Sequence, residues 1–594
     1  MWPSTVASRL GSNKGENMKL NSRKMKNLIM SVALGLLVPT SANALPENPQ
    51  VVHGSATVTV NGQNMSIQQA TQQAIINWHG FSIQSGEMVR FLQPSQVAAI
   101  LNRVQGVDPS VINGILEGNG TVMLINPNGV LIGPGGSVNT GSFLASTLDV
   151  SDADFLAGRL AFEQDTSVDL ASIVNQGKIQ VADGGFVVLT SPSVSNEGLI
   201  LARAGSVNIG AGTQATVNFD GRKLLHFSVD LQGDGALLLS KQQTNDVLAQ
   251  VVNNGGVQEA GSLNNSGLIE ANRVNFQSTG NLNLPGETRS QDILAQAEGD
   301  ANLGSHFALD GHSIDISAGG DITFDTLVAE GLNGVGGVVD LSAGGSVLAN
   351  EGGLGIAGDV VNLRADTGNI STPVSADSIS AEAPLGSVNL DITPGRIDGE
   401  TLVGERGTTL FVNAGSNVNV DSVNTLFIDR VSGSQVRLNS ATGSIADAGD
   451  TPGADNRDII ASQGASLSAA EFIGTVDQPL EVDIQGDLTV QARSEISGTS
   501  GVLNGFVGGD FFQDSATAGV VFLNYNGSDA SIQRAQLGIL DNANTIEDES
   551  GLGGATVPAL FFTYLTGSTD EDEWLDLLRG AVVWEDEVDE ADEL

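Results

Sequence analysis

The side chains best suited to chemistry in this 594-residue chain are carboxylates, since it has 69 acidic residues, five histidines and no cysteine. A glycosidase needs two carboxyl groups held at bond-cleaving separation. The nearest candidates are Asp310, His312, Asp315 and Asp321. However, Asp315 lies in an alternating Ile-Asp-Ile segment and is repeated as Asp340, so we expect it to face solvent from a strand. No catalytic residue is assigned.

Metal and nucleophile signatures are also missing from the sequence. The histidines are scattered, lack the spacing of a metal-binding motif, and are expected at the surface or in turns. They are His53, His79, His226, His306 and His312. The absence of cysteine removes thiolate nucleophiles and Cys-ligated metal sites. No phosphate-binding Gly-rich loop or nucleophile elbow is evident. We predict no enzyme, no cofactor and no metal site.

Charge and composition narrow the class of protein. The net charge is −44, but the first 44 residues hold six basic and one acidic residue, which leaves 19 basic and 68 acidic residues in the remainder. Such an acidic surface repels nucleic acid and anionic membranes. Glycine supplies 75 residues and aromatics only 4%, while 40% of residues are apolar. This balance favours short strands joined by tight turns over disorder or a compact globular core.

The N-terminus has the order of features of an export signal. Basic residues precede an apolar stretch from Leu28 to Val38, which is too short to cross a bilayer comfortably. Ala42 and Ala44 then supply the small-x-small cleavage pattern. We predict a signal peptide at residues 1–44, with Met18 as an alternative start. No later stretch reaches about 18 uninterrupted apolar residues, so the chain is not expected to be an integral membrane protein.

A five-residue motif recurs along the middle of the chain. Residues 175–179, Asn-Gln-Gly-Lys-Ile, recur as Asn-Glu-Gly-Leu-Ile at 196–200 and as Asn-Ser-Gly-Leu-Ile at 265–269. Residues 314–322 recur 25 residues later at 339–347. Periods of about 20–27 residues indicate a solenoid.

The repeating unit predicts the fold class. An alternating strand puts its aliphatic residues on one face, and a Gly/Asn-rich turn follows, with no helical period between strands. We predict an all-β fold, a right-handed single-stranded parallel β-helix (solenoid) with an N-terminal cap and extra β-elements, of some 22 coils at about 22 residues each. Two stretches, Ile67 to Ile76 and Pro94 to Arg103, look helical instead. Separate β-sandwiches or a propeller are the alternatives, but propeller repeats run nearer about 40 residues.

Composition also suggests boundaries. We predict an N-terminal core at residues 45–165 that extends to about residue 290, repeats at 166–505, and the end of the β-rich rod at 506–565. From residue 570 onward the chain has 12 acidic residues against one arginine. Residues 566–594 are therefore predicted to be a solvated acidic tail that caps the rod, with a short docking helix as the alternative.

A more specific pattern begins near the N-terminus. It comprises, in order, residues 74–84, 87–93, 101–104, 115–133 and 138–149. This order resembles the secretion domain of two-partner secretion exoproteins, and it looks most like the high-molecular-weight adhesin branch of the filamentous-haemagglutinin family. Many haemagglutinins carry an earlier Asn-Pro-Asn-Leu motif. Here residues 101–106 read Leu-Asn-Arg-Val-Gln-Gly, which puts in doubt any recognition role for that earlier motif.

Within this pattern, Asn126, Pro127, Asn128 and Gly129 predict a tight turn between two strands. Pro127 presets φ near roughly −65°, and Asn128 or Gly129 can adopt positive φ. The resemblance implies that this tetrapeptide is a secretion motif recognised by the periplasmic domains of a transporter. A purely structural role in shaping the first coils is the alternative.

The resemblance also implies a route and partners. The Sec machinery would deliver an unfolded chain to the periplasm, and a TpsB-type outer-membrane transporter barrel would pass it to the cell surface or medium of a Gram-negative bacterium. The lack of cysteine fits this route, because disulfides formed in the periplasm would hinder threading. We expect a haemagglutinin-like adhesin or matrix protein that binds host or bacterial surface glycans or proteins. The alternatives are a β-helix polysaccharide-active enzyme and a secreted cytolysin or toxin carrier.

Overall fold

The structure is a computed structural model. It describes residues 45–219, 225–230, 263–308, 313–329, 337–393, 397–398, 401–402, 407–449, 456–475, 478–492, 502–509, 511–513 and 521–523. The chain divides into two units, residues 1–44 and 45–594, and every described residue belongs to the second. The predicted cleavage residues Ala42 and Ala44, the acidic tail at 566–594 and most of 506–565 lie outside the described residues.

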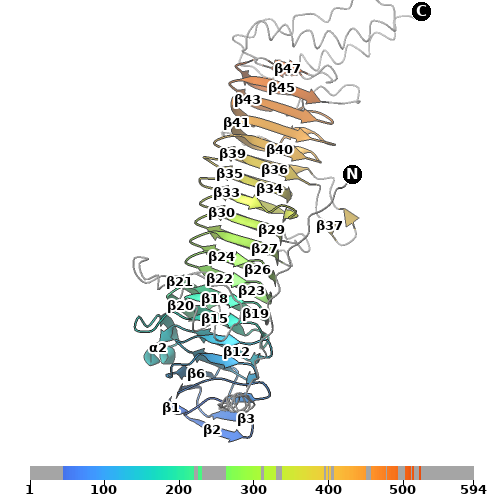
Figure 1. The fold of residues 1–594 in the computed structure, drawn as a ribbon. Coiled ribbons are helices and arrows are strands. Elements are labelled where there is room, and N and C mark those ends of the chain that lie inside the picture. Colours follow the sequence, from blue (N-terminus) through green and yellow to red (C-terminus); the bar gives the residue numbers. More distant parts are fainter. Residues whose placement is uncertain are drawn as a thin grey trace, which may run out of the picture. The chain divides into compact units, whose positions relative to one another are not determined.

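Within the described ranges, forty-two strands join in one continuous sheet that winds into a column of parallel coils (Figure 1). The predicted all-β parallel β-helix is confirmed, and over the described residues it has about 16 turns, against some 22 coils predicted for the chain. One reason for the smaller number is that parts of the chain leave the column between paired strands. For example, Asn196 pairs with Asn265, and the chain between them passes through a separate antiparallel sheet.

The column has three faces of parallel strands. The first face contains β4 (Gln73–Trp78), β6 (Ala99–Val104), β9 (Thr121–Ile125), β12 (Ser142–Ser146), β17 (Phe186–Ser191), the second halves of β19 (Leu199–Ala211) and β23 (Leu268–Ser278), β26 (Asp292–Ala297), β28 (Ser313–Ala318), β30 (Val338–Ala343), β33 (Val360–Ala365), β35 (Ser378–Ala383) and β39 (Thr408–Ala414).

The second face contains β7 (Ser110–Ile112), β10 (Val130–Ile132), β15 (Ser172–Asn175), β18 (Ser193–Asn196), β22 (Leu263–Asn265), β24 (Leu282–Leu284), the first halves of β27 (Ala301–Ala308) and β29 (Ile322–Ala329), β31 (Val347–Ala349), β34 (Ile370–Ser375), β36 (Val388–Ile392) and β40 (Val418–Ser422). The third face contains β3 (Asn64–Gln69), β5 (Met88–Leu92), β8 (Ile115–Gly118), β11 (Ser137–Thr140), β16 (Lys178–Val181), the first halves of β19 and β23, β25 (Glu287–Ser290), the second halves of β27 and β29, and β32 (Gly355–Ala357).

Beyond Ser422 the coils continue with strands of 3 to 15 residues. They are β41 (Leu426–Ser440), β42 (Ile445–Asp447), β43 (Ile459–Ala469), β44 (Leu480–Ile484), β45 (Asp487–Ala492), β46 (Val502–Val507), β47 (Phe511–Gln513) and β48 (Val521–Leu523). A two-stranded hairpin, β37 (Ile397–Asp398) and β38 (Thr401–Leu402), lies outside the column's sheet.

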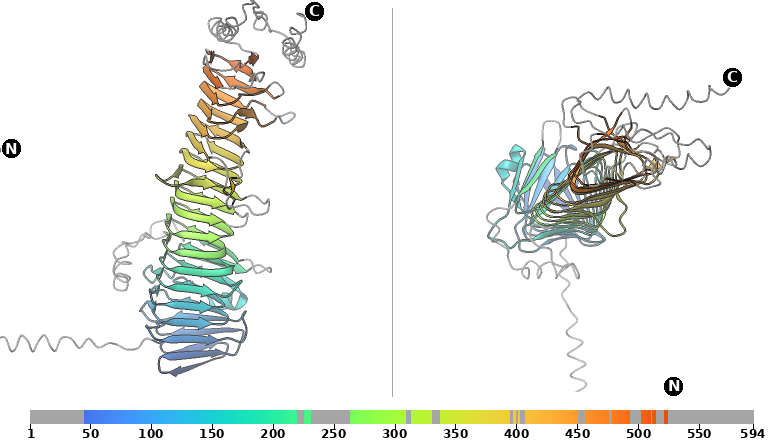
Figure 2. Two further views of the ribbon diagram at one scale, coloured as in Figure 1. Left: turned by 90° about the vertical axis from the view of Figure 1, so that its right-hand side faces the viewer. Right: turned by 90° about the horizontal axis from the view of Figure 1, so that it is seen from above.

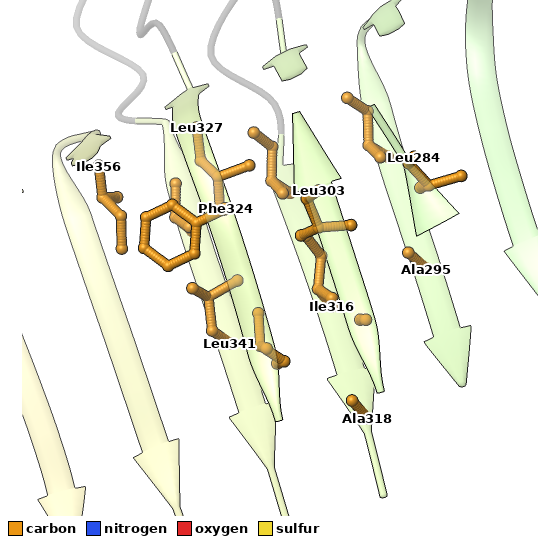
Figure 3. Packing of buried hydrophobic residues seen from close by; sticks show 14 of the residues in the cluster. Leu284, Ala295, Leu303, Ile316, Ala318, Phe324, Leu327, Leu341 and Ile356 are labelled. Atoms are coloured by element: carbon orange, nitrogen blue, oxygen red, sulfur yellow. The ribbon is translucent and has the colours of Figure 1, made fainter. Parts of the chain in front are cut away.

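Alternation along each strand fills the interior of the column. On β28, Ile314, Ile316 and Ala318 point inward, while Asp315 faces out. Figure 3 shows such inward side chains from successive coils gathered between the strands. Each coil buries its aliphatic residues against the coils above and below, so stability accrues between neighbours along the column.

The first coil is closed by antiparallel strands. β1 (Gln50–His53) pairs with β4, and β2 (Ala56–Asn61) pairs with β3. The stretches Ile67 to Ile76 and Pro94 to Arg103 are therefore not helical, because they contain β3, β4 and β6, whose residues pair with the following coils. Pairing within the column overrides the local helical pattern.

A second apolar cluster lies on the outward side of the first face. Ile75, Leu101, Met123, Leu144 and Val188 point away from the column and remain buried. They are covered by a four-stranded antiparallel sheet, beside the lower coils in Figures 1 and 2, together with one short helix. These elements are β13 (Asp149–Val150), α2 (Asp152–Ala157), β14 (Arg159–Glu163), β20 (Gln214–Phe219) and β21 (Leu225–Asp230).

Candidate functional site

The predicted secretion motif is a turn whose first side chain is wholly internal. Asn126 has no exposed surface, and its Nδ2 donates to the carbonyl oxygen of Asp108 and to Oγ of Ser110, each at 3.0 Å. Its Oδ1 accepts from the backbone N–H of Asn128 at 2.9 Å. Every polar atom of the Asn126 side chain is thus used to hold the turn against the preceding coil.

The rest of the motif completes the same turn. Of the two residues expected to be able to adopt positive φ, Gly129 does so, with φ of 114°, and its N–H donates to the carbonyl of Asn126 at 3.1 Å. Nδ2 of Asn128 donates to the carbonyl of Gly106 at 2.8 Å. Pro127 and Asn128 are the partly exposed members of the tetrapeptide, whereas Asn126 and Gly129 are buried.

Residues 101–106, which stand where the earlier haemagglutinin motif would lie, have two structural roles on β6. Inside the column, Oδ1 of Asn102 accepts from Nε1 of Trp78 at 3.0 Å, and its Nδ2 donates to the carbonyl of Met123 at 3.1 Å. Outside, Arg103 binds Asp149 at 2.9 Å and Asp152 at 2.7 Å, which fastens the covering sheet and helix to the column. Sequence reasoning missed both residues.

The repeated Asn-x-Gly motif also has a structural basis. Nδ2 of Asn175 donates to Oδ1 of Asn196 at 2.7 Å, and Nδ2 of Asn196 donates to Oδ1 of Asn265 at the same distance. All three side chains are fully buried, so they form an internal ladder that runs along the column axis.

The glycines of this repeated motif also stack from coil to coil. A Cβ added to Gly198 would lie 2.2 Å from the carbonyl oxygen of Gly177, and one added to Gly267 would lie 2.1 Å from that of Gly198. Backbones of successive coils therefore approach too closely at this corner for any side chain. The repetition seen in the sequence thus reflects contact between coils.

The described candidate carboxylates belong to the scaffold. Asp315 is exposed on β28 and in register with Asp340 on β30, as expected. Burial of part of its surface and the neighbouring Asp340 raise the pKa of Asp315. Asp321 is a turn residue whose N–H donates to Oδ1 of Asp300 at 3.0 Å and whose Oδ1 accepts from the N–H of Ser346 at 2.7 Å. Asp310 and His312 lie outside the described residues.

The histidines divide into two groups. His53 and His79 are exposed, as expected. His306 is 1% exposed and faces the interior on β27, so the expectation of a surface or turn position was wrong for it. The side chain of His226 and all of His312 lie outside the description. Over the described ranges, no group of three His, Cys, Asp or Glu side chains could hold a metal ion.

Within the part of the chain that the structure covers, no helix has the length and apolar character needed to span a bilayer.

The chain is similar to several known proteins. The family model described as "TPS secretion domain" matches residues 42–284. A heme/hemopexin-binding protein of Haemophilus influenzae is 32% identical over 232 residues, which are 38% of this chain and 24% of that protein. A second protein of the same name and species is 39% identical over 106 residues, 18% of this chain and 11% of the other. The chain thus matches a quarter or less of the length of these curated relatives.

Two solved structures are also similar. The HMW1 secretion domain from Haemophilus influenzae has 23% sequence identity and a TM-score of 0.33, with 81% of this chain and 100% of that chain covered. A filamentous hemagglutinin secretion domain has 14% identity and a TM-score of 0.27, with 52% and 98% covered.

The family match begins before the first described strand and ends at Leu284, the last residue of β24, so it includes the N-terminal cap, the motif turn and the outer sheet. Residues 42–284 match the TPS secretion domain, the domain of two-partner secretion exoproteins, and this match covers less than half of the chain.

Proposed function

We propose that the secretion domain is recognised in the periplasm by a TpsB-type outer-membrane transporter barrel after delivery by the Sec machinery. The rod that follows then acts at the cell surface or in the medium as a non-enzymatic adhesive surface. The observation that best supports this proposal is the unbroken parallel pairing of strands from the secretion domain into the rod. β18 pairs with β22, β22 with β24, and β24 with β27, on the far side of the family match.

Continuous pairing matters because it makes the secretion domain the first part of the same stack. An exported chain that folds from its N-terminus finds a finished coil edge on which the next coil can dock. Folding outside the cell then disfavours return of the chain. The exposed surface of such a rod is long and regular, which suits binding to extended glycans or to other cells.

The motif turn supports transporter recognition in a limited way. In the folded turn Asn126 and Gly129 are buried, so we assign contact with a transporter that binds the formed turn to Pro127 and Asn128. Pro127→Ala leaves the internal hydrogen bonds of Asn126 in place, whereas Asn126→Ala removes them. The two substitutions therefore separate recognition from folding.

The experiment compares release of the full chain from cells with and without a partner transporter. We expect release only with the transporter, and Pro127→Ala should lower both release and binding to the transporter's periplasmic domains without lowering the melting temperature of the purified protein. Equal release without any transporter would refute the route. Normal binding by the Pro127→Ala protein would leave the motif a purely structural role.

The ligand requires a separate test. The purified secreted chain should bind cells or a subset of immobilised glycans if it is an adhesin. The names of the two relatives make hemopexin and heme the first competing ligands to include in the same assay. Saturable binding of hemopexin without binding to cells or glycans would replace the adhesin proposal. Release of new sugar ends from a polysaccharide would instead support the enzyme alternative.

A further inference from the structure

His306 occupies an inward position in the middle of the rod. It lies on β27 between Thr288 of β25 and Leu327 of β29, with which it is in register, and only 1% of its surface is exposed. Leu284, Leu303 and Phe324, seen in Figure 3, form another inward stack in the same coils. The imidazole thus stands where other coils carry an aliphatic side chain.

The imidazole ring of His306 lacks well-formed hydrogen bonds at this position. Neither Nδ1 nor Nε2 of His306 has a hydrogen-bond partner of good geometry in the described structure, and Oγ1 of the neighbouring Thr288 has none either. A neutral imidazole can be accommodated in such a site, but a charged one is disfavoured, because the nearby carbonyl of Leu284 and the charge of Asp325 only partly replace the water lost on burial.

Charged groups on the surrounding strands do not remedy this. The charged residues on the strands packed against β27 are Glu287, Arg289, Asp292, Asp315 and Asp325. All five are partly or fully exposed, and Glu287 and Arg289 pair with each other at 2.6 Å. Asp325 accepts from Nδ2 of Asn350 at 2.9 Å. Burial lowers the pKa of His306 to about 4, although the carbonyl of Leu284 and the charge of Asp325 partly oppose the shift.

We propose that His306 makes the middle of the rod acid-sensitive, so that the coils from β25 to β29 open on moderate acidification while other coils remain closed. The folded state holds the proton more weakly than the unfolded chain does. At a pH above 6.5, the pKa of histidine in the unfolded chain, the region has its full stability. This stability is lost as the pH falls from 6.5 towards about 4, the pKa of His306 in the folded protein. Because coils interact mainly with their neighbours, the opening stays local. This inference does not depend on the proposed function.

Amide hydrogen exchange of the full secreted protein, read by mass spectrometry at pH 7 and pH 4.5, tests the proposal. After correction for the intrinsic pH dependence of exchange, protection of peptides from β25 to β29 should fall by roughly 60-fold between pH 7 and pH 4.5, from linkage between a pKa of 6.5 in the unfolded chain and about 4 in the folded protein. Peptides from β9 to β12 should change much less.

Three variants make the test specific. His306→Leu and His306→Gln carry no titrating group, so either one that folds should keep its protection in these coils at pH 4.5. The matched control, His79→Gln, replaces an exposed histidine and should behave like the parent protein. Unchanged protection in the parent protein at pH 4.5 would overturn the proposal. So would an equal loss of protection in the folded His306 variants.

Discussion

Nδ2 of Asn196 donates a 2.7 Å hydrogen bond to Oδ1 of Asn265, which lies 69 residues further along the chain. The preceding rung, from Asn175 to Asn196, has the same distance over only 21 residues. The column therefore keeps its register across a long departure of the chain. A buried amide ladder accepts only a partner at the same inward position, so it specifies which strand resumes the stack.

Replacing the central rung should show how much the ladder contributes. Asn196→Ala leaves Nδ2 of Asn175 and Oδ1 of Asn265 without their partner inside the column, and we expect a loss of about 2–4 kcal/mol in the free energy of unfolding. The control is Asn264→Ala, which removes a partly exposed outer rung and should cost less than about 1 kcal/mol. Urea unfolding of both variants gives the comparison, and equal losses would contradict an internal role.

The glycine corner predicts a steric effect. In Gly198→Ala the new methyl carbon would meet the carbonyl oxygen of Gly177 at 2.2 Å, so neighbouring coils must separate, at a cost of about 1–3 kcal/mol. Gly80→Ala is the matched control, because nothing lies within 4 Å of its added carbon. Thermal unfolding should separate the two, and a Gly198→Ala protein as stable as the control would show that the corner can relax.

The coils around Asp458, which include β43 and β44, should lose stability as the pH rises. Asp458 is 2% exposed, and its Oδ2 accepts from the N–H of Glu481 at 2.8 Å. Burial, together with the nearby carboxyl groups of Glu481 and Asp447, raises the pKa of Asp458, although the N–H of Glu481 opposes this.

The folded state therefore binds the proton more tightly than the unfolded chain, and its advantage fades as the pH rises above about 4. Asp458→Asn keeps an acceptor for Glu481 but cannot ionise. We expect it to raise hydrogen-exchange protection of β43 and β44 at pH 8 and to change it little at pH 4.5. The same gain at both pH values would show that charge is not the cause.

The role of Arg103 in fastening the outer sheet to the column can be tested by proteolysis. Besides its two carboxylate partners, Arg103 donates from Nη2 to the carbonyl of Val150 at 2.6 Å, and its side chain is 14% exposed. Arg103→Ala leaves these groups unpaired, so we expect cleavage between residues 149 and 163 to become several-fold faster. Arg90→Ala removes an exposed pair with Glu117 and should leave the rate unchanged. Similar rates for both variants would argue against this role.

Local patterns were sufficient to predict much of the fold. Alternation such as Ile314-Asp-Ile316 placed aliphatic residues inward and Asp315 outward, and the tight turn at Gly129 followed from residue type. The predicted secretion motif was also recognisable as a turn. The sequence did not predict that all hydrogen-bonding atoms of the Asn126 side chain are used within the fold, because the groups that its Nδ2 binds belong to the preceding coil.

The misses share one cause. His306 and Phe307 are adjacent, and hydrophobicity alone would place Phe307 inward, yet stacking with Thr288 and Leu327 places the histidine there. Likewise, Leu101 and Met123 face outward but are buried, because a sheet formed by distant residues covers them. In both cases the phase of a strand or its covering is set by neighbours that are remote in sequence.

By itself, the sequence determined that the chain is built from short aliphatic strands with glycine corners, because strand alternation and turn chemistry are local properties. Only the tertiary structure decided which rungs meet, since the spacing between stacked residues is not constant: it is 21 from Asn175 to Asn196 and 69 from Asn196 to Asn265. It also decided which polar groups are sealed inside, since burial depends on the coils above and below and leaves no local signature.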